Sequence, residues 1–155
     1  RMITIRLATA DDFMALYRLG EAMRQEAITH FPKLDAKRAS EFLDMAIEQP
    51  DTARVVVAED DEGLIGMMTS MMGGYAFSYE KKAVSDLLFV LPEKRGAIAA
   101  KKLVQDFIQW AKDNDAPAAF IGVSTGTDNE RTGKFFEKMG FHHMGLSYKM
   151  ELNHV

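Results

Sequence analysis

One stretch of the sequence combines residue types that could hold a phosphate: the turn and helix start from Pro92 to Lys101. A strand-like run leads directly into this helix, so the first amides of the helix have no partner within it and carry partial positive charge. An anion can bind at such a helix start. In Arg95-Gly96-Ala97-Ile98-Ala99-Ala100 every side chain except Ile98 is small or basic, which lets a phosphate approach the backbone. The same residues also suit a tight strand-to-helix corner without a ligand.

Asp86 is a candidate acid-base residue within the strand-like run 83–91. On an ideal strand it shares one face with three apolar residues, Val84, Leu88 and Val90. Burial among apolar neighbours raises the pKa of a carboxyl group above its ordinary value of about 3.9, toward the range of a general base at neutral pH. The alternative is a structural Asp that is paired with a nearby Lys or Arg.

The elements before this central unit follow from the spacing of the apolar residues. The sequence predicts a strand at 3–7, a helix at about 10 to 29, a second helix capped by Asp35, and a hairpin with strands at 54–58 and 64–72. Residues 73–82, with two glycines and several polar side chains, are expected to form a long loop.

The elements after it complete a mixed fold. The apolar run at 117–124 predicts a buried strand, and the amphipathic helix that opens at residue 97 makes a crossover between it and the strand at 83–91, so these two strands should be parallel. A short helix is expected from Asn129 to Met139, with a stop at Gly140, and residues 141–152 are expected to give a last strand or a bent pair. No linker or repeat divides the chain, so 1–155 is predicted to be a single domain.

Composition excludes several classes of protein. The chain has 155 residues, of which 47% are hydrophobic and 27% are charged, as in globular domains. A formal net charge of -4 argues against non-specific nucleic-acid binding, and no apolar run is long enough for a membrane span. The absence of cysteine excludes disulfides, cysteine catalysis and thiolate metal sites. We see no charged and apolar leader before the first strand, so a cytoplasmic location is expected.

The order strand, helix, helix, three strands, helix, strand, helix, strand, together with two motifs, resembles the GNAT superfamily of N-acetyltransferases. The first motif is the Q/R-x-x-G-x-G/A turn that follows a strand, here Arg95-Gly96-Ala97-Ile98-Ala99-Ala100 after Leu88-Phe89-Val90. The second is the Asn-led helix with a glycine-aromatic stop, here Asn129 to Phe141. The resemblance implies an α/β fold with a central mixed sheet flanked by helices.

The resemblance also implies a co-substrate and a set of site residues. In the family the turn binds the pyrophosphate of acetyl-CoA, and the amides of the preceding strand meet the pantetheine and the acetyl oxygen. Carried over, the residues that would bind acetyl-CoA are Leu88, Phe89, Val90, Arg95, Gly96, Ala97, Ile98, Ala99, Ala100, Lys101, Asn129 and Phe136. Asp86 occupies the place where some members carry a carboxylate base that acts through water.

Two residues depart from the family pattern. Ile98 replaces the middle glycine of the turn, which would weaken or displace the cofactor if the backbone must approach closely there. Phe136 stands where many members have a tyrosine as general acid toward the leaving thiolate, and phenylalanine has no proton to donate. Tyr148 and Ser124 are the candidates for that acid, because both are expected on strands near the cleft.

The resemblance therefore implies transfer of an acetyl group from acetyl-CoA to a primary amine of a small molecule or protein, by direct attack of the amine on the thioester. The expected partners are acetyl-CoA and an amine acceptor, with neither metal, nucleic acid nor membrane, and a homodimer is left open. The alternative is a GNAT-like module with weak or no catalysis that binds CoA or serves as an interaction domain, which Ile98 and Phe136 favour. A dinucleotide-binding domain is disfavoured, because G-x-G-x-x-G is absent.

Overall fold

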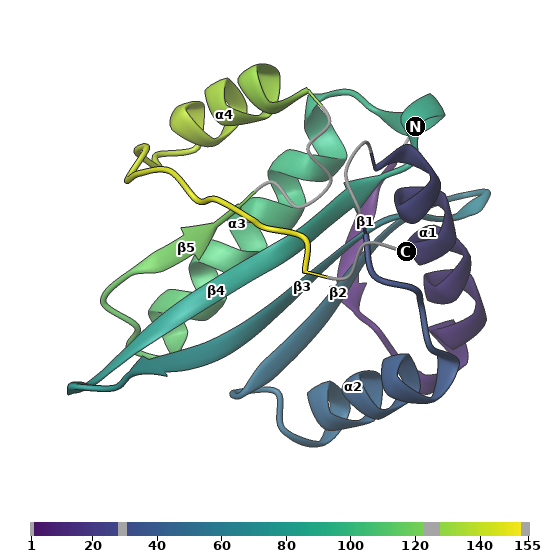
Figure 1. The fold of residues 1–155 in the computed structure, drawn as a ribbon. Helices are drawn as coiled ribbons and strands as arrows, with labels where there is room; N and C mark the ends of the chain where they lie inside the picture. The colour runs from purple at the N-terminus through teal and green to yellow at the C-terminus, as the bar shows by residue number, and fades with distance from the viewer. Residues whose placement is uncertain (1, 28–30, 123–127, 153–155) are drawn as a thin grey trace.

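The computed structural model describes residues 2–27, 31–122 and 128–152, with the side chains of all but Asp86 and Ala97. In this part of the chain five strands form one sheet in the order β1-β2-β3-β4-β5, flanked by helices (Figure 1). The strands are β1 (Thr4–Leu7), β2 (Ala53–Asp60), β3 (Gly63–Tyr75), β4 (Ser78–Val90) and β5 (Ala119–Ile121). The helices are α1 (Phe13–Glu26), α2 (Ala36–Glu48), α3 (Ala97–Asp113) and α4 (Asn129–Lys138), with single 3-10 turns η1 (Ala10–Asp12) and η2 (Pro92–Lys94). The expected mixed sheet flanked by helices is confirmed.

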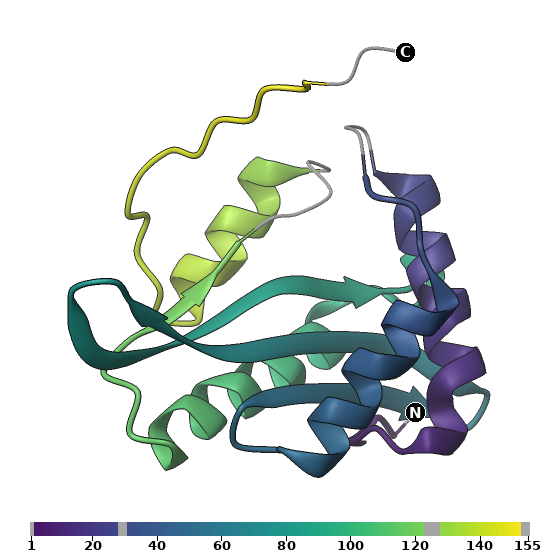
Figure 2. The ribbon, with the colours of Figure 1, turned by 60° about the horizontal axis from the view of Figure 1, so that its bottom comes forward.

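Successive side chains of β2 point to opposite faces of the sheet and pack in two different hydrophobic clusters. Val56 and Ala58 of β2 pack with α3, whereas Val55 and Val57 pack with α2. Helix α1 contributes a third cluster on its own part of the sheet, formed by Leu19, Met23, Met67 and Phe89. Figure 2 shows α3 on one side of the sheet and α4 on the other side of β4 and β5 in that view. The described part of the chain contains no helix that is long and apolar enough to cross a membrane.

β1 to β4 are antiparallel neighbours, and β4 and β5 are parallel, as the crossover through α3 predicts. The parallel ladder is short, because it joins only Ala83 to Ala119, Val84 to Phe120 and Ser85 to Ile121. A last hydrogen bond runs from the Gly122 amide to the Ser85 carbonyl at 3.2 Å. The expected strand at 117–124 is therefore shorter, and residues 123–127 lie outside the described part of the chain.

A bulge interrupts β4 where its pairing with β5 ends. Ser85 and Asp86 of β4 lie opposite the single residue Ser70 of β3, since the pairs on either side are Met71 with Val84 and Thr69 with Leu87. The Ser85 hydroxyl donates to the Thr69 carbonyl oxygen at 2.8 Å, which satisfies a buried polar side chain at the bulge.

This bulge corrects the ideal alternation that the sequence predicts for β4. The extra residue shifts the period by one, so the residues that share the α3 side of the strand are Ala83, Leu88 and Val90. Val84 is not among them. The expectation that Val84 shares one face with Leu88 and Val90 is therefore wrong, and the side chain of Asp86 lies outside the described part of the structure.

The first helix and residues 73–82 differ from their predicted structure. α1 ends at Glu26 rather than near residue 29, with extended backbone at Ala27. Residues 73–82 are not a long loop: β3 and β4 continue to Tyr75 and from Ser78, joined by a two-residue turn. The glycines there read as loop residues, but the long ladder with β4 outweighs their low strand preference.

The last expected strand is also absent within the described residues. Residues 141–152 have no strand or helix, and they run as an extended segment along the outside of α4, away from the sheet (Figure 2).

An ionic network, which we call the N-terminal corner, fixes the first strand to the first helix. Arg6 of β1 donates to both carboxylate oxygens of Asp12 at 2.7 and 2.9 Å and to Glu59 of β2 at 2.8 Å. The Asp12 carboxylate also accepts from the Thr9 amide at 2.7 Å. These hydrogen bonds, from Arg6 above all, lower the pKa of Asp12 to about 2, and Arg6 likewise lowers the pKa of Glu59.

Candidate functional site

A cleft of about 650 Å³ opens where β4 and β5 part. β4 continues five residues beyond its last pair with β5, and the described residues place no strand on that side of Leu88, Phe89 and Val90. These three residues line the cleft floor, together with Gly122 just after β5. The cleft is as large as the pockets that hold small-molecule and cofactor ligands.

The start of α3 forms one wall of the cleft. Gly96 is the N-cap residue, and no side chain caps the first amides of the helix. A Cβ atom built on Gly96 would meet no atom within 4 Å outside its chain neighbours, so the space beside Gly96 at the helix start is open. Ala100 also lines the cleft, one turn into the helix. A 17-residue helix whose unpartnered amides face a cleft suits an anionic group.

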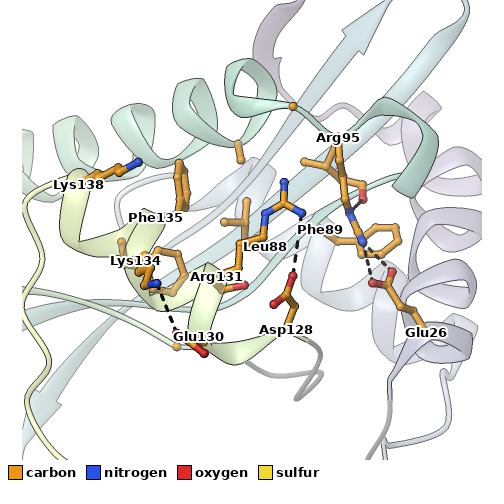
Figure 3. Close-up of a pocket in the computed structure, with 16 residues that line it drawn as sticks. Glu26, Leu88, Phe89, Arg95, Asp128, Glu130, Arg131, Lys134, Phe135 and Lys138 are labelled. Carbon is orange, nitrogen blue, oxygen red and sulfur yellow. Dashed lines mark hydrogen bonds and ion pairs between the residues drawn. The ribbon is translucent and has the colours of Figure 1, made fainter.

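Arg95 lies beside this helix start and is already engaged by three groups. Its Nη atoms donate to both carboxylate oxygens of Glu26 at 2.7 and 2.6 Å, and its Nε donates to the Val90 carbonyl oxygen at 2.9 Å. Its guanidinium carbon lies 5.5 Å from the centre of the Phe89 ring. The ion pair of Arg95 with Glu26 therefore connects α1 to the wall of the cleft at the start of α3 (Figure 3).

α4 supplies the opposite wall, which carries most of the charge. Arg131, Lys134 and Lys138 line the cleft from this helix. Two of them have carboxylate neighbours: Arg131 lies 4.0 Å from Asp128 and Lys134 lies 3.3 Å from Glu130. Both cations are largely exposed, so a ligand phosphate could displace these weak pairs (Figure 3).

The cleft brings together most of the residues that the sequence predicts for cofactor binding. Those that line it are Leu88, Phe89, Val90, Arg95, Gly96, Ala100 and Phe136. Ile98 does not line the cleft, and it is 58% exposed. Ala99 is buried in the core, and neither Lys101 nor Asn129 is among the lining residues. The side chain of Ala97 is outside the described part of the structure.

Of the three predicted catalytic residues, the structure describes the side chain of Tyr148 alone. Asp86 lies in the β4 bulge, and its side chain is outside the described part of the structure. Ser124 lies outside the described residues altogether. Tyr148 is 88% exposed in the extended C-terminal segment and does not line the cleft. Phe136 lines it and is buried against Phe135 and Phe141, at ring distances of 5.9 and 6.1 Å.

Sequence reasoning missed the charged wall and Glu26. The lining residues that it did not assign to the site, although several belong to the Asn129–Phe141 motif, are Glu26, Gly122, Asp128, Glu130, Arg131, Thr132, Lys134, Phe135 and Lys138. Helical spacing offers a signal for part of this set, because Asp128, Arg131, Phe135 and Lys138 recur every three or four residues on α4. No local pattern marks Glu26, which reaches the cleft only because α1 packs beside the end of β4.

Within the described residues, no group of three His, Asp or Glu side chains is placed to hold a metal ion. The arrangement therefore offers the ligand two things: backbone amides at a helix start and along a strand edge, and cationic side chains on α4. These suit a molecule with phosphates at one end and a neutral extended arm at the other.

Comparison with known proteins accounts for this geometry. The model of the acetyltransferase (GNAT) family matches residues 16–141, which is most of the chain. This chain belongs to the GNAT acetyltransferase family. The resemblance seen in the two sequence motifs is thus confirmed, and the matched residues contain the whole cleft, from Glu26 to Lys138. No curated protein matches the sequence.

Solved structures of acetyltransferases share the fold over nearly the whole chain. Glucosamine-6-phosphate N-acetyltransferase from Arabidopsis thaliana has a TM-score of 0.75 at 16% identity, covering 99% of this chain and 100% of that one. Ribosomal-protein-alanine N-acetyltransferase from Brucella melitensis biovar Abortus 2308 has a TM-score of 0.74 at 18% identity, with 97% and 100% covered. An aminoglycoside acetyltransferase from a soil metagenomic sample has a TM-score of 0.75 at 17% identity, with 97% of each chain covered.

Proposed function

We propose that this GNAT protein is an N-acetyltransferase that moves the acetyl group of acetyl-CoA to a primary amine of a small molecule or a protein. The observation that carries the proposal is the cleft itself, which is lined both by the uncapped start of α3, at Gly96 and Ala100, and by the part of β4 from Leu88 to Val90 that has no strand partner on this side among the described residues. The pyrophosphate would lie over the amides from Gly96 to Lys101, and the pantetheine arm would run along Leu88 to Val90.

The charges of the cleft support this placement. Arg131, Lys134 and Lys138 stand on the wall opposite the helix start, where they could approach the phosphates of a nucleotide from the other side. Phe89 and Phe136 supply apolar surface between the two walls, which suits the uncharged arm of the co-substrate.

The proposed reaction is a direct transfer. The neutral amine nitrogen attacks the thioester carbonyl carbon, the carbon–sulfur bond breaks, the nitrogen loses a proton and the thiolate of CoA gains one. The protein must hold the two reactants together and stabilise the developing negative charge on the carbonyl oxygen, which an amide of the β4 edge could do.

Two proton transfers accompany this reaction, one from the amine and one to the thiolate. Asp86, in the bulge where β4 leaves β5, is our candidate for the base that receives the amine proton through water. Phe136 cannot protonate the thiolate, so the acid is Tyr148, Ser124 or solvent. We expect Phe136→Tyr to raise the turnover if an acid at that position is what the protein lacks.

Release of free thiol from acetyl-CoA tests the proposal. The protein is incubated with acetyl-CoA and a panel of amines that spans aminosugars, polyamines, amino acids and peptides with free N-termini. We expect amine-dependent thiol release with at least one acceptor, and acetylated product of the matching mass. Tight CoA binding without release for any amine would favour a binding module, and absence of both would overturn the proposal.

A further inference from the structure

A nearly buried ion pair lies just before the start of α3. The Nζ atom of Lys94, the last residue of η2, is 3.0 Å from Oδ2 of Asp60, the last residue of β2. Only 1% of the Asp60 side chain and 16% of the Lys94 side chain are exposed. Removing a charge from water is costly unless an opposite charge or a hydrogen bond meets it. Because the two residues are 34 positions apart, the pair joins segments that are distant in the sequence.

Asp60 also shapes the turn between β2 and β3. Its Oδ1 atom accepts a hydrogen bond from the Glu62 amide at 2.8 Å, and the Glu62 carboxylate lies 3.1 Å from Lys94 Nζ. The turn therefore presents two carboxylates to one ammonium group. β2 and β3 pair on either side of it, beginning with Asp60 and Gly63, so the carboxylates stand on a fixed support.

The backbone of η2 is attached to the same hairpin at its other end. The Leu91 amide donates to the Ile65 carbonyl oxygen of β3 at 2.8 Å, and the Lys94 amide donates to the Leu91 carbonyl oxygen at 2.9 Å. Residues 91–94 are thus joined to the β2–β3 hairpin by a backbone hydrogen bond where they begin and by an ion pair where they end.

Lys94 and Arg95 are neighbours in the chain but contact different parts of the molecule. Arg95 lines the cleft and pairs with Glu26 of α1, whereas Lys94 pairs with the β2–β3 turn and is not among the lining residues. A ligand in the cleft would meet Arg95 but not the Lys94 side chain. Lys94 can therefore affect such a ligand only through the backbone that connects it to α3.

The start of α3 depends on this backbone. The N-cap residue Gly96 has an extended backbone and brings no side chain, and among the described residues no side chain caps the first amides of the helix. The position of these amides is therefore set largely by the turn that precedes them. A site that binds through fixed donors must be held to within about 0.5 Å of its productive geometry.

We propose that Lys94 is a positioning residue for the phosphate site. Its ion pair with Asp60 fixes η2 against the β2–β3 turn and so places the first amides of α3 where the pyrophosphate of acetyl-CoA would bind. This inference rests on the acetyl-CoA binding proposed above, and it adds a residue that the ligand does not touch.

Calorimetry with acetyl-CoA tests the inference in charge-matched variants. We expect Lys94→Met, which removes the ammonium group, to bind acetyl-CoA about tenfold more weakly than the wild type, and Lys94→Arg, which keeps a cation, to recover most of the affinity. The control is Lys102→Met. It removes a cation from α3 that does not line the cleft and whose Nζ donates to the Ile3 carbonyl oxygen, and it should bind like the wild type.

A double variant separates positioning from stability. Lys94→Met alone leaves the buried Asp60 carboxylate without its cation and should lower the melting temperature. Adding Asp60→Asn removes that charge and keeps a side-chain oxygen for the Glu62 amide, so the melting temperature should rise again. The affinity for acetyl-CoA should stay about tenfold reduced, because the ion pair that fixes η2 is still absent.

Steady-state kinetics give a second measurement that loss of structure would not reproduce. With an amine that supports thiol release, the double variant should have a KM for acetyl-CoA raised about tenfold, while kcat and the KM for the amine remain those of the wild type.

Three results would overturn the inference, and they differ in what else they overturn. If the wild type does not bind acetyl-CoA, the proposed function fails together with the inference. If the wild type binds but folded Lys94→Met binds equally well, the inference alone fails. It also fails alone if the double variant regains its affinity together with its melting temperature, because Lys94 then serves stability only.

Discussion

The two ends of the sheet are built in opposite ways. At the β1 end, the N-terminal corner pairs its charges with one another, and the antiparallel ladders of β1 with β2 and of β2 with β3 contain four and eight residue pairs. At the β5 end the ladder is three residues long, and the charges of α4 face a cleft. Among the described residues, every buried hydrophobic side chain except that of Phe136 precedes residue 112.

This difference separates stability from ligand binding along the chain. The residues before 112 contain nearly all of the hydrophobic core. The cleft lies between the end of β4, the start of α3 and helix α4, of which Phe136 alone is a buried hydrophobic residue. Regions with few buried apolar residues have the lower local stability, and sites that bind ligands are often found there. Substitutions at the two ends should therefore change different measured quantities.

The largest effect is expected at the bulge of β4. If Asp86 is the base of the proposed reaction, Asp86→Asn should lower kcat by about 10²-fold and leave the dissociation constant of acetyl-CoA nearly unchanged. Steady-state kinetics and calorimetry measure the two quantities, and Asp115→Asn, at an exposed aspartate outside the cleft, is the control. A variant with normal kcat and a normal pH–rate profile would remove Asp86 from the mechanism.

The N-terminal corner should show the opposite behaviour. Asp12→Asn removes the carboxylate that Arg6 and the Thr9 amide hold, and we expect a loss of about 2 kcal/mol in the free energy of unfolding at pH 7 with no change in acetyl-CoA affinity. Because the pKa of Asp12 is lowered to about 2, this contribution is present above the ordinary carboxyl pKa and is lost as the pH falls from about 4 toward 2.

Urea unfolding of the wild type and the variant at pH 7 and pH 3 measures this contribution. The stability difference between the two proteins should be smaller at pH 3, where Asp12 is mostly protonated in the unfolded wild type but still mostly ionised in the folded one. Asp11→Asn, at the exposed neighbour, is the control. If the free energies of unfolding of Asp12→Asn and the wild type differ by the same amount at pH 7 and at pH 3, the assigned pKa of Asp12 is contradicted.

The smallest effect is expected at Arg95, which lies in the cleft but is already paired with α1. Its guanidinium lines the cleft but is already bound by Glu26 and the Val90 carbonyl. Arg95→Ala should weaken acetyl-CoA binding only about threefold, roughly 0.7 kcal/mol. Glu26→Gln weakens the ion pair with Arg95, so this variant should bind acetyl-CoA slightly more tightly than the wild type. If calorimetry finds weaker binding instead, Glu26 itself supports the ligand.

Sequence reasoning predicted the fold where the pattern is local. The strand before Pro92, the amphipathic helix α3 and the Asp35 cap of α2, whose carboxylate accepts from the Arg38 amide at 2.9 Å, follow from spacing and capping rules alone. The motif residues at the start of α3 and the end of β4 could also be placed at the cleft, because strand, turn and helix start are contiguous in the chain.

The rest depended on contacts between distant segments. The bulge at Ser85 arises from a register shift against β3, which the sequence of β4 does not reveal. Two glycines and a polar run predict a loop at residues 73–82. In the structure, pairing across the hairpin outweighs this local preference. Glu26 and the cations of α4 enter the site through packing. The period of two after Gly140 does indicate a strand, but the described structure gives it no partner within one chain.

Calorimetric titration of acetyl-CoA tests the central claim, that the uncapped start of α3 is where this GNAT protein holds its co-substrate. Gly96→Val fills the open space before the helix amides, and Gly74→Val is the matched control, because a Cβ on Gly74 also meets nothing within 4 Å but lies far along β3. We predict binding by the wild type, equal binding by Gly74→Val, and at least about tenfold weaker binding by a folded Gly96→Val, about 1.4 kcal/mol. No heat of binding to the wild type at millimolar acetyl-CoA, or equal affinity in all three proteins, would contradict the claim.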